Sequence, residues 1–72
     1  MQITAKGKIA KQGFGFGTWA FTTTDGTTYE LYEPPNELAK EIDSVTIEGV
    51  IREDVMTAAN IGQVLEVHAF EL

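Results

Sequence analysis

Hydrophobic and polar residues alternate with period two along most of the chain. In residues 2–12, Ile3, Ala5 and Ile9 fall on one side and Thr4, Lys6 and Lys8 fall on the other. This alternation is typical of a strand with one buried face, and the glycine in its middle favours a bend. The same alternation, together with β-branched and aromatic residues, predicts further strands over residues 18–24, 27–32, 44–52 and 63–72.

Turn and helix signals separate the predicted strands. Asp25 and Gly26 lie between two β-branched runs, which predicts a two-residue hairpin loop. Pro34 and Pro35 end the third strand, and Asn36 after them has the properties of a helix N-cap. We therefore expect one short helix of about two turns between the third and fourth strands, ending near residue 43.

The predicted order is strand, strand, strand, helix, strand, strand within a single domain of residues 1–72. A chain of 72 residues has no room for a second domain and must bury nearly all its apolar side chains in one core. The order resembles that of the OB-fold, a five-stranded Greek-key barrel. Residues 45–51 and 62–67 also look like the last two strands of small bacterial OB-like proteins. The resemblance implies an all-β fold class, a closed barrel with one short helix plugging it.

A glycine-rich segment carries a second, more local resemblance. The sequence Lys-Gln-Gly-Phe-Gly-Phe at residues 11–16 is similar to the Lys-Gly-Phe-Gly-Phe segment of bacterial cold-shock domains, and Ala-Ala-Asn-Ile at 58–61 is similar to their Ala-Ala-Asn-Val. In that family the two phenylalanines stack on bases of single-stranded RNA or DNA. The resemblance implies base stacking on Phe14 and Phe16, with Lys8 and Lys11 near the phosphates.

Charge is distributed unevenly along the chain. Residues 1–24 contain three lysines and no acid, a net charge of +3, and residues 25–72 contain the other 2 basic and all 11 acidic residues, a net charge of −9. The sum of −6 repels polyanions such as nucleic acids. In addition, Tyr-Glu-Leu-Tyr at residues 29–32 places a carboxylate where cold-shock domains have Val-Phe-Val-His-Phe. Both features favour a protein or peptide partner, with single-stranded nucleic acid as the alternative.

The candidate contact surface combines the first strand with the segment that follows it. On an OB-like barrel, these elements, the second strand and the connection over residues 53–62 form the ligand surface. The candidate binding residues are Lys6, Lys8, Lys11, Phe14, Phe16, Trp19 and Tyr32. The alternative role of the aromatic rings is structural, because a chain this small needs such side chains in its core or as a cap on the barrel end.

Catalytic and metal-binding chemistry is not indicated. The chain has one histidine, His68, one serine, Ser44, and no cysteine, and its acidic residues lack calcium-loop spacing. We therefore expect a non-enzymatic binding module without a cofactor. Neither a run of about 18 apolar residues nor a signal-peptide pattern occurs, which predicts a cytoplasmic protein that does not span a membrane. Self-association that buries Phe70 and Leu72, or the Phe14 segment, is a third alternative.

Overall fold

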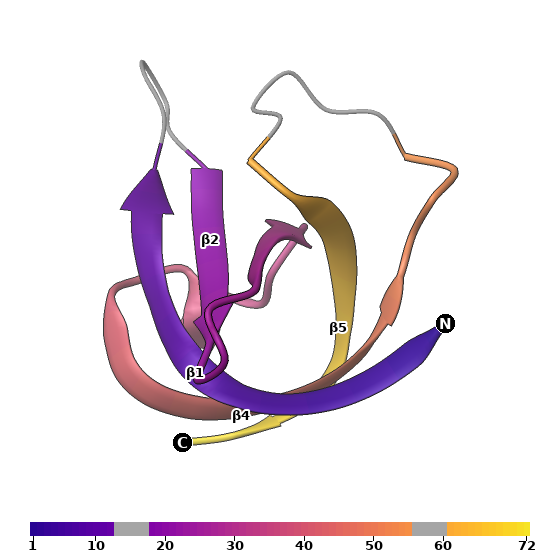
Figure 1. Cartoon of the computed structure of the whole chain (residues 1–72). Helices are drawn as coiled ribbons and strands as arrows, with labels where there is room; N and C mark the ends of the chain where they lie inside the picture. The colour runs from indigo at the N-terminus through magenta and orange to yellow at the C-terminus, as the bar shows by residue number, and fades with distance from the viewer. Residues whose placement is uncertain (13–17, 56–60) are drawn as a thin grey trace.

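Five β-strands and one short helical turn make up the part of the chain that the structure describes. The structure is a computed structural model, and it describes residues 1–12, 18–55 and 61–72 (Figure 1). All five strands agree, to within two residues at each end, with the stretches that the alternation predicts. The strands are β1 (Gln2–Gln12), β2 (Thr18–Thr23), β3 (Thr28–Tyr32), β4 (Ile42–Ile51) and β5 (Gln63–Glu71).

The strands close into a ring in the order β1-β2-β3-β5-β4. β3 and β5 pair in parallel, and all other neighbours in the ring pair antiparallel. β1 pairs with both β2 and β4 because it bends, and its register with β4 shifts between Gly7 and Ile9. Figure 1 shows β1 and β4 curving together around the lower side of the ring. The prediction of an all-β barrel is therefore confirmed.

The core fills the inside of the ring with the side chains that the alternation places on one face. The ring of Phe21, which is fully buried, stacks on Tyr29 with the two centroids 6.5 Å apart. Trp19 and Tyr29 are half-buried and pack against the same cluster. The buried members of the cluster are Ile9, Phe21, Leu31, Leu38, Val45, Ile47, Ile51 and Leu65. Burial of each large apolar side chain contributes roughly 1.5–3 kcal/mol, which matters in a chain without disulfides.

The helix expected over residues 36–43 is not formed. Instead, Asn36–Leu38 make a single turn of 3-10 helix, η1. Pro35 occupies the N-cap position that Asn36 was expected to take, and no side-chain cap bond forms there. A second turn is prevented because Ile42 already belongs to β4, where it pairs with Ile9. The single turn is sufficient to bury Leu38 completely in the core.

The β2–β3 hairpin forms at the predicted place, with a longer loop than expected. The Thr23 amide donates to the Thr27 carbonyl at 2.8 Å, and the Gly26 amide donates back to the Thr23 carbonyl at 3.0 Å. The loop therefore holds three residues, 24–26, rather than two. Gly26 takes a φ of +92°, and the Asp25 carboxylate accepts a bond from the Thr27 amide at 3.1 Å. A turn followed by a left-handed glycine is a common form of three-residue hairpin loop.

The last strand departs from simple alternation. Its register with β4 shifts between Glu48 and Gly49, which leaves His68 as an extra residue on β5. Such a bulge reverses which side of the sheet the following residues face. Simple alternation from Leu65 and Val67 would place Ala69 on the inner side, but Ala69 is exposed as a result of the bulge, and Phe70 packs against the core instead.

Candidate binding surface

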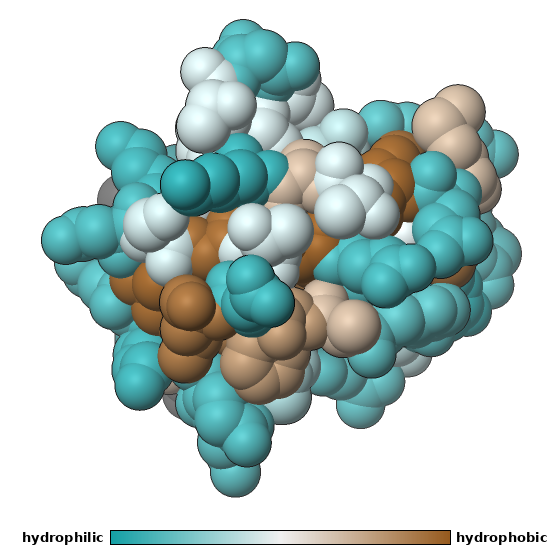
Figure 2. Space-filling view, turned by 90° about the horizontal axis from the view of Figure 1, so that it is seen from below, coloured by the Kyte–Doolittle hydropathy of each residue, from teal (hydrophilic) through white to brown (hydrophobic). Residues whose placement is uncertain are grey.

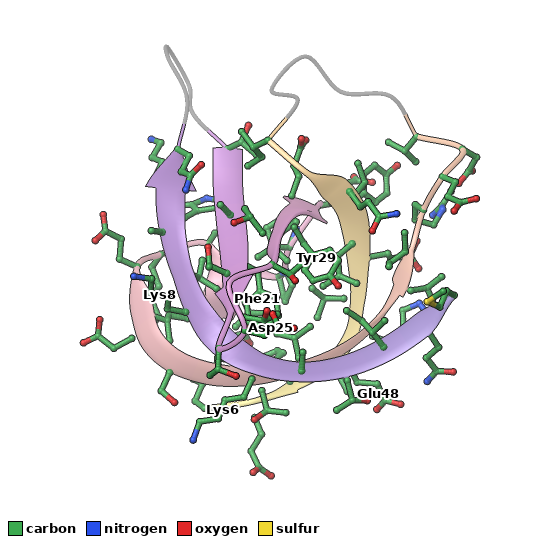
Figure 3. The ribbon with its side chains drawn as sticks, viewed as in Figure 1. Lys6, Lys8, Phe21, Asp25, Tyr29 and Glu48 are labelled. Atoms are coloured by element: carbon green, nitrogen blue, oxygen red, sulfur yellow. The ribbon has the colours of Figure 1, made fainter. Side chains whose placement is uncertain are left out.

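The first-strand lysines lie on the outside of the barrel, but the bend in β1 separates them. Lys8 lies opposite Thr22 of β2, whereas Lys6 lies opposite Thr46 of β4. In Figure 3, Lys8 lies at the side of the barrel and Lys6 lies below it. Both lysines are exposed, and neither forms an ion pair with a residue that the structure describes. Lys6 and Lys8 therefore both lie on the outer side of β1, Lys8 where β1 pairs with β2 and Lys6 where it pairs with β4.

A shallow pocket of about 200 Å³ lies beside Lys8. Its hydroxyl groups come from the end of β2, where the Thr22 and Thr28 hydroxyls lie 3.3 Å apart. The lining residues are Gly7, Lys8, Thr22, Thr23, Thr24 and Asp43. One cation, one carboxylate and several hydroxyls make this a polar groove.

Lys11 and Trp19 lie opposite each other on β1 and β2. The Lys11 ammonium lies 6.0 Å from the centroid of the indole ring, at the outer limit of a cation–π contact. Trp19 is half-buried and packs against the core, so the ring has a structural role as well. The structure thus brings together two of the predicted binding residues. Phe14 and Phe16 lie outside the described residues.

Tyr32, the last residue of β3, packs against a guanidinium group. The Cζ atom of Arg52 lies 5.5 Å from the centroid of the Tyr32 ring. Arg52 donates to both carboxylate oxygens of Asp54, from Nε at 2.9 Å and from Nη2 at 2.8 Å, and donates from Nη1 to Glu66. Glu66 Oε2 in turn lies 2.8 Å from His68 Nε2. We call these five residues the Arg52 cluster.

Sequence reasoning identified only Tyr32 among the members of the Arg52 cluster. The cluster joins the ends of β3 and β4 to the middle of β5, and Arg52 and Glu66 are 14 residues apart in the chain. The pairing of Val50 with Glu66 across β4 and β5 brings them together. The Arg-Glu-Asp sequence at residues 52–54 is a signal for the Arg52–Asp54 pair alone.

The charges of the Arg52 cluster are largely balanced within it. Hydrogen bonding to Arg52 lowers the pKa of Asp54 to about 2. Hydrogen bonding to His68, and secondly to Arg52, lowers the pKa of Glu66 below its ordinary value. Two carboxylates at neutral pH therefore compensate one guanidinium. This arrangement fixes the chain after β4 against β5 and leaves little positive charge to attract a phosphate.

Glu30 in the middle of β3 is a carboxylate with only 6% of its surface exposed. It lies between Ala20 of β2 and Val64 of β5, which are also buried. This is the strand on which the cold-shock resemblance requires stacking or neutral residues. A buried carboxylate provides no ring for a base to stack on, so the centre of β3 does not reproduce a base-stacking surface.

The remaining expectations concern metal ions, membranes and known relatives. In residues 1–12, 18–55 and 61–72, no group of three or more His, Asp or Glu side chains is arranged to hold a metal ion. The same ranges contain no helix that is both long and apolar enough to span a bilayer. No protein-family model, no curated protein and no solved structure matches the chain. Its function must therefore be argued from its own geometry.

Proposed function

We propose that this chain is a non-enzymatic binding module built on an OB-type barrel, and that its partner is a protein or peptide. The ring order β1-β2-β3-β5-β4, with β3 and β5 in parallel, supports the OB-type Greek-key arrangement. The short η1 turn between β3 and β4, with Leu38 as its buried residue, stands where the plugging helix of such a barrel is expected.

The main support for a protein or peptide partner is the arrangement of the cationic side chains. Arg52 is held by two carboxylates, and Lys11 lies over Trp19. Lys6 and Lys8 are exposed on the outer side of β1, on a chain whose net charge is −6. A single-stranded nucleic acid needs several cations along one continuous path, because phosphate neutralisation dominates its binding. Few uncompensated cations on an acidic protein suit a partner with few charges.

The proposed contact surface is the outer side of β1 and β2 around Lys8. Each described strand already has two neighbours in the ring, so a partner cannot bind by adding a strand to an edge. It must instead bind through side chains. The polar pocket beside Lys8 offers hydroxyl groups from β2 and both signs of charge, from Lys8 and Asp43, for this purpose.

Site-specific photo-crosslinking tests this proposal. A photoreactive amino acid replaces Lys8 in one variant and Glu37, an exposed residue of η1, in a matched control. We expect the Lys8 variant to form a protein adduct in cells that the Glu37 variant does not form and that resists nuclease treatment. A nuclease-sensitive adduct, or the same adducts from both positions, contradicts the proposal.

The second candidate is a single-stranded nucleic-acid binder of the cold-shock type. One observation favours it: Trp19 contacts Lys11, which the cold-shock resemblance places near the phosphates. The buried Glu30 and the net charge oppose it. Its distinguishing property is a steep dependence of binding on salt.

A further inference from the structure

The outer side of β1, β4 and β5 forms a second face, distinct from the surface around Lys8. A shallow depression of about 220 Å³ lies in it. Figure 2 views this lower side of the barrel and shows a broken band of apolar residues crossing it between hydrophilic ones. The residues that line the depression are Thr4, Thr46, Glu48, Ala69, Phe70 and Glu71.

Charged groups are arranged symmetrically across this lower face. Thr46 on β4 pairs with Lys6 on one side and with Glu71 on the other. Lys6 and Glu71 are therefore separated by one strand, about 10 Å in total. Neither forms an ion pair with another residue that the structure describes. A cation and a carboxylate thus lie at equal distances from Thr46, on opposite sides.

We propose that two copies of this chain associate through the lower face in a symmetric dimer. The two-fold axis of this dimer lies in the interface, parallel to β4 and beneath Thr46. A rotation of 180° about it exchanges the β1 side of the face, which carries Lys6, with the β5 side, which carries Glu71. It places Lys6 of each copy against Glu71 of the other, which gives two equivalent ion pairs. This self-complementarity is what a two-fold interface requires, because residue i of one copy must fit residue j of the other in both directions.

Apolar surface and the size of the face indicate the strength of association. Phe70 packs against the core and also lines the depression, and Leu72, two residues further along the chain, is 67% exposed. The barrel measures 27 × 25 × 24 Å along its principal axes. A face of it offers on the order of 600 Å² per copy, near the lower limit for a specific interface. We therefore expect a dissociation constant in the micromolar range rather than a permanent dimer.

Glu48 lies near the axis of the proposed dimer, where its counterpart in the second copy approaches it. Its carboxylate accepts a hydrogen bond from Gln2 Nε2 of β1 at 2.8 Å. Figure 3 shows Glu48 and Lys6 projecting from the lower side of the barrel. Two carboxylates near one axis oppose association, so Glu48→Gln is expected to lower the dissociation constant about threefold.

Sedimentation equilibrium over protein concentrations from about 10 µM to 1 mM tests the dimer. We expect a reversible monomer–dimer equilibrium. Lys6→Glu and Glu71→Lys should each raise the dissociation constant about fivefold or more, and the double swap should bring it back to within about twofold of the parent value. All three variants change only exposed residues, and circular dichroism checks that the barrel is retained.

The Glu71→Lys variant separates the specific ion pair from general charge effects. It reduces the net charge from −6 to −4, so simple repulsion between copies would predict tighter association, whereas the proposed pair predicts weaker association. Glu53→Lys makes the same charge change at an exposed residue outside the lower face and should not weaken the dimer. A monomer throughout the concentration range overturns the proposal. A double swap no better than the single variants also overturns it.

Discussion

The backbone of Gly7 lies directly against the backbone carbonyl of Thr22, where β1 bends from β4 onto β2. A Cβ atom at residue 7 would lie 2.1 Å from the Thr22 carbonyl oxygen and 2.8 Å from its carbon. Only glycine allows this approach. Because β1 must pair on both sides to close the ring, the bend at Gly7 is a condition for the whole barrel.

Replacing Gly7 with alanine should therefore strongly destabilise the protein. The atoms in the way belong to the backbone and move only if the sheet moves, so we expect a loss of about 3 kcal/mol in the free energy of unfolding, measured in urea. Gly26→Ala is the matched control. Gly26 has open space around it and only its φ of +92° opposes a side chain, which costs roughly 1–2 kcal/mol. An equal loss in the two variants would contradict the steric account of the bend.

The Arg52 cluster should make stability depend on pH in the acid range. The folded protein lowers the pKa of Asp54 from 3.8 to about 2 and lowers the pKa of Glu66 from 4.5. Carboxyl groups whose pKa is lowered on folding stabilise the protein above their ordinary pKa, and this stabilisation is lost as the pH falls toward the folded value. We expect the Tm to drop between about pH 4.5 and pH 2, and to drop less in Arg52→Gln.

The control for that experiment is Lys40→Gln. It removes one positive charge from an exposed residue that takes no part in the Arg52 cluster. Its acid profile should keep the slope of the parent protein. If both variants flatten the profile equally, the loss of a cation anywhere is responsible, and the lowered pKa values of Asp54 and Glu66 are not.

Removing the buried side chain of Leu38 from the turn between β3 and β4 should lower the free energy of unfolding strongly, whereas removing the exposed side chain of Asn36 should hardly change it. Leu38 is fully buried, so Leu38→Ala should cost about 2–5 kcal/mol in the free energy of unfolding. Asn36 is exposed, and η1 has no side-chain cap bond, so Asn36→Ala should change it by about 0.5 kcal/mol or less. Chemical denaturation measures both. A loss of about 1 kcal/mol or more for Asn36→Ala would contradict this expectation and indicate that Asn36 is the N-cap that the sequence predicts.

The alternation of residue types predicts the strands well because each strand buries one face in a single core. It does not predict the phase change at His68, since a bulge depends on how β5 pairs with β4 and leaves no mark on β5 alone. The helix signal at Asn36 fails for a similar reason: the pairing of Ile42 with Ile9 takes residues that a second helical turn would need. Local sequence thus predicts the positions of the strands. Pairing between strands that are distant in the sequence decides where a bulge forms and where a helix stops.

The candidate binding residues also show which features the sequence predicts and which depend on strand pairing. The sequence places Lys6 and Lys8 on one side of one strand, and their side chains are exposed as expected. The bend at Gly7 places Lys6 where β1 pairs with β4 and Lys8 where it pairs with β2, which alternation alone does not reveal. Arg52 was missed because its carboxylate partner Glu66 reaches it only through the β4–β5 register.

Trp19 provides an optical test of the proposed partner class. Its indole lies 6.0 Å from the Lys11 ammonium, so a base or phosphate that enters this region changes its fluorescence. We expect no saturable change when short single-stranded oligonucleotides are added up to about 50 µM at about 50 mM salt, because the net charge of −6 repels their phosphates. Lys11→Gln serves as the control, since it removes the cation from the ring and reports the emission of Trp19 without it. Saturable quenching in the parent that is lost at about 200 mM salt, and is weaker in Lys11→Gln, would require a nucleic-acid strand as the partner in place of a protein.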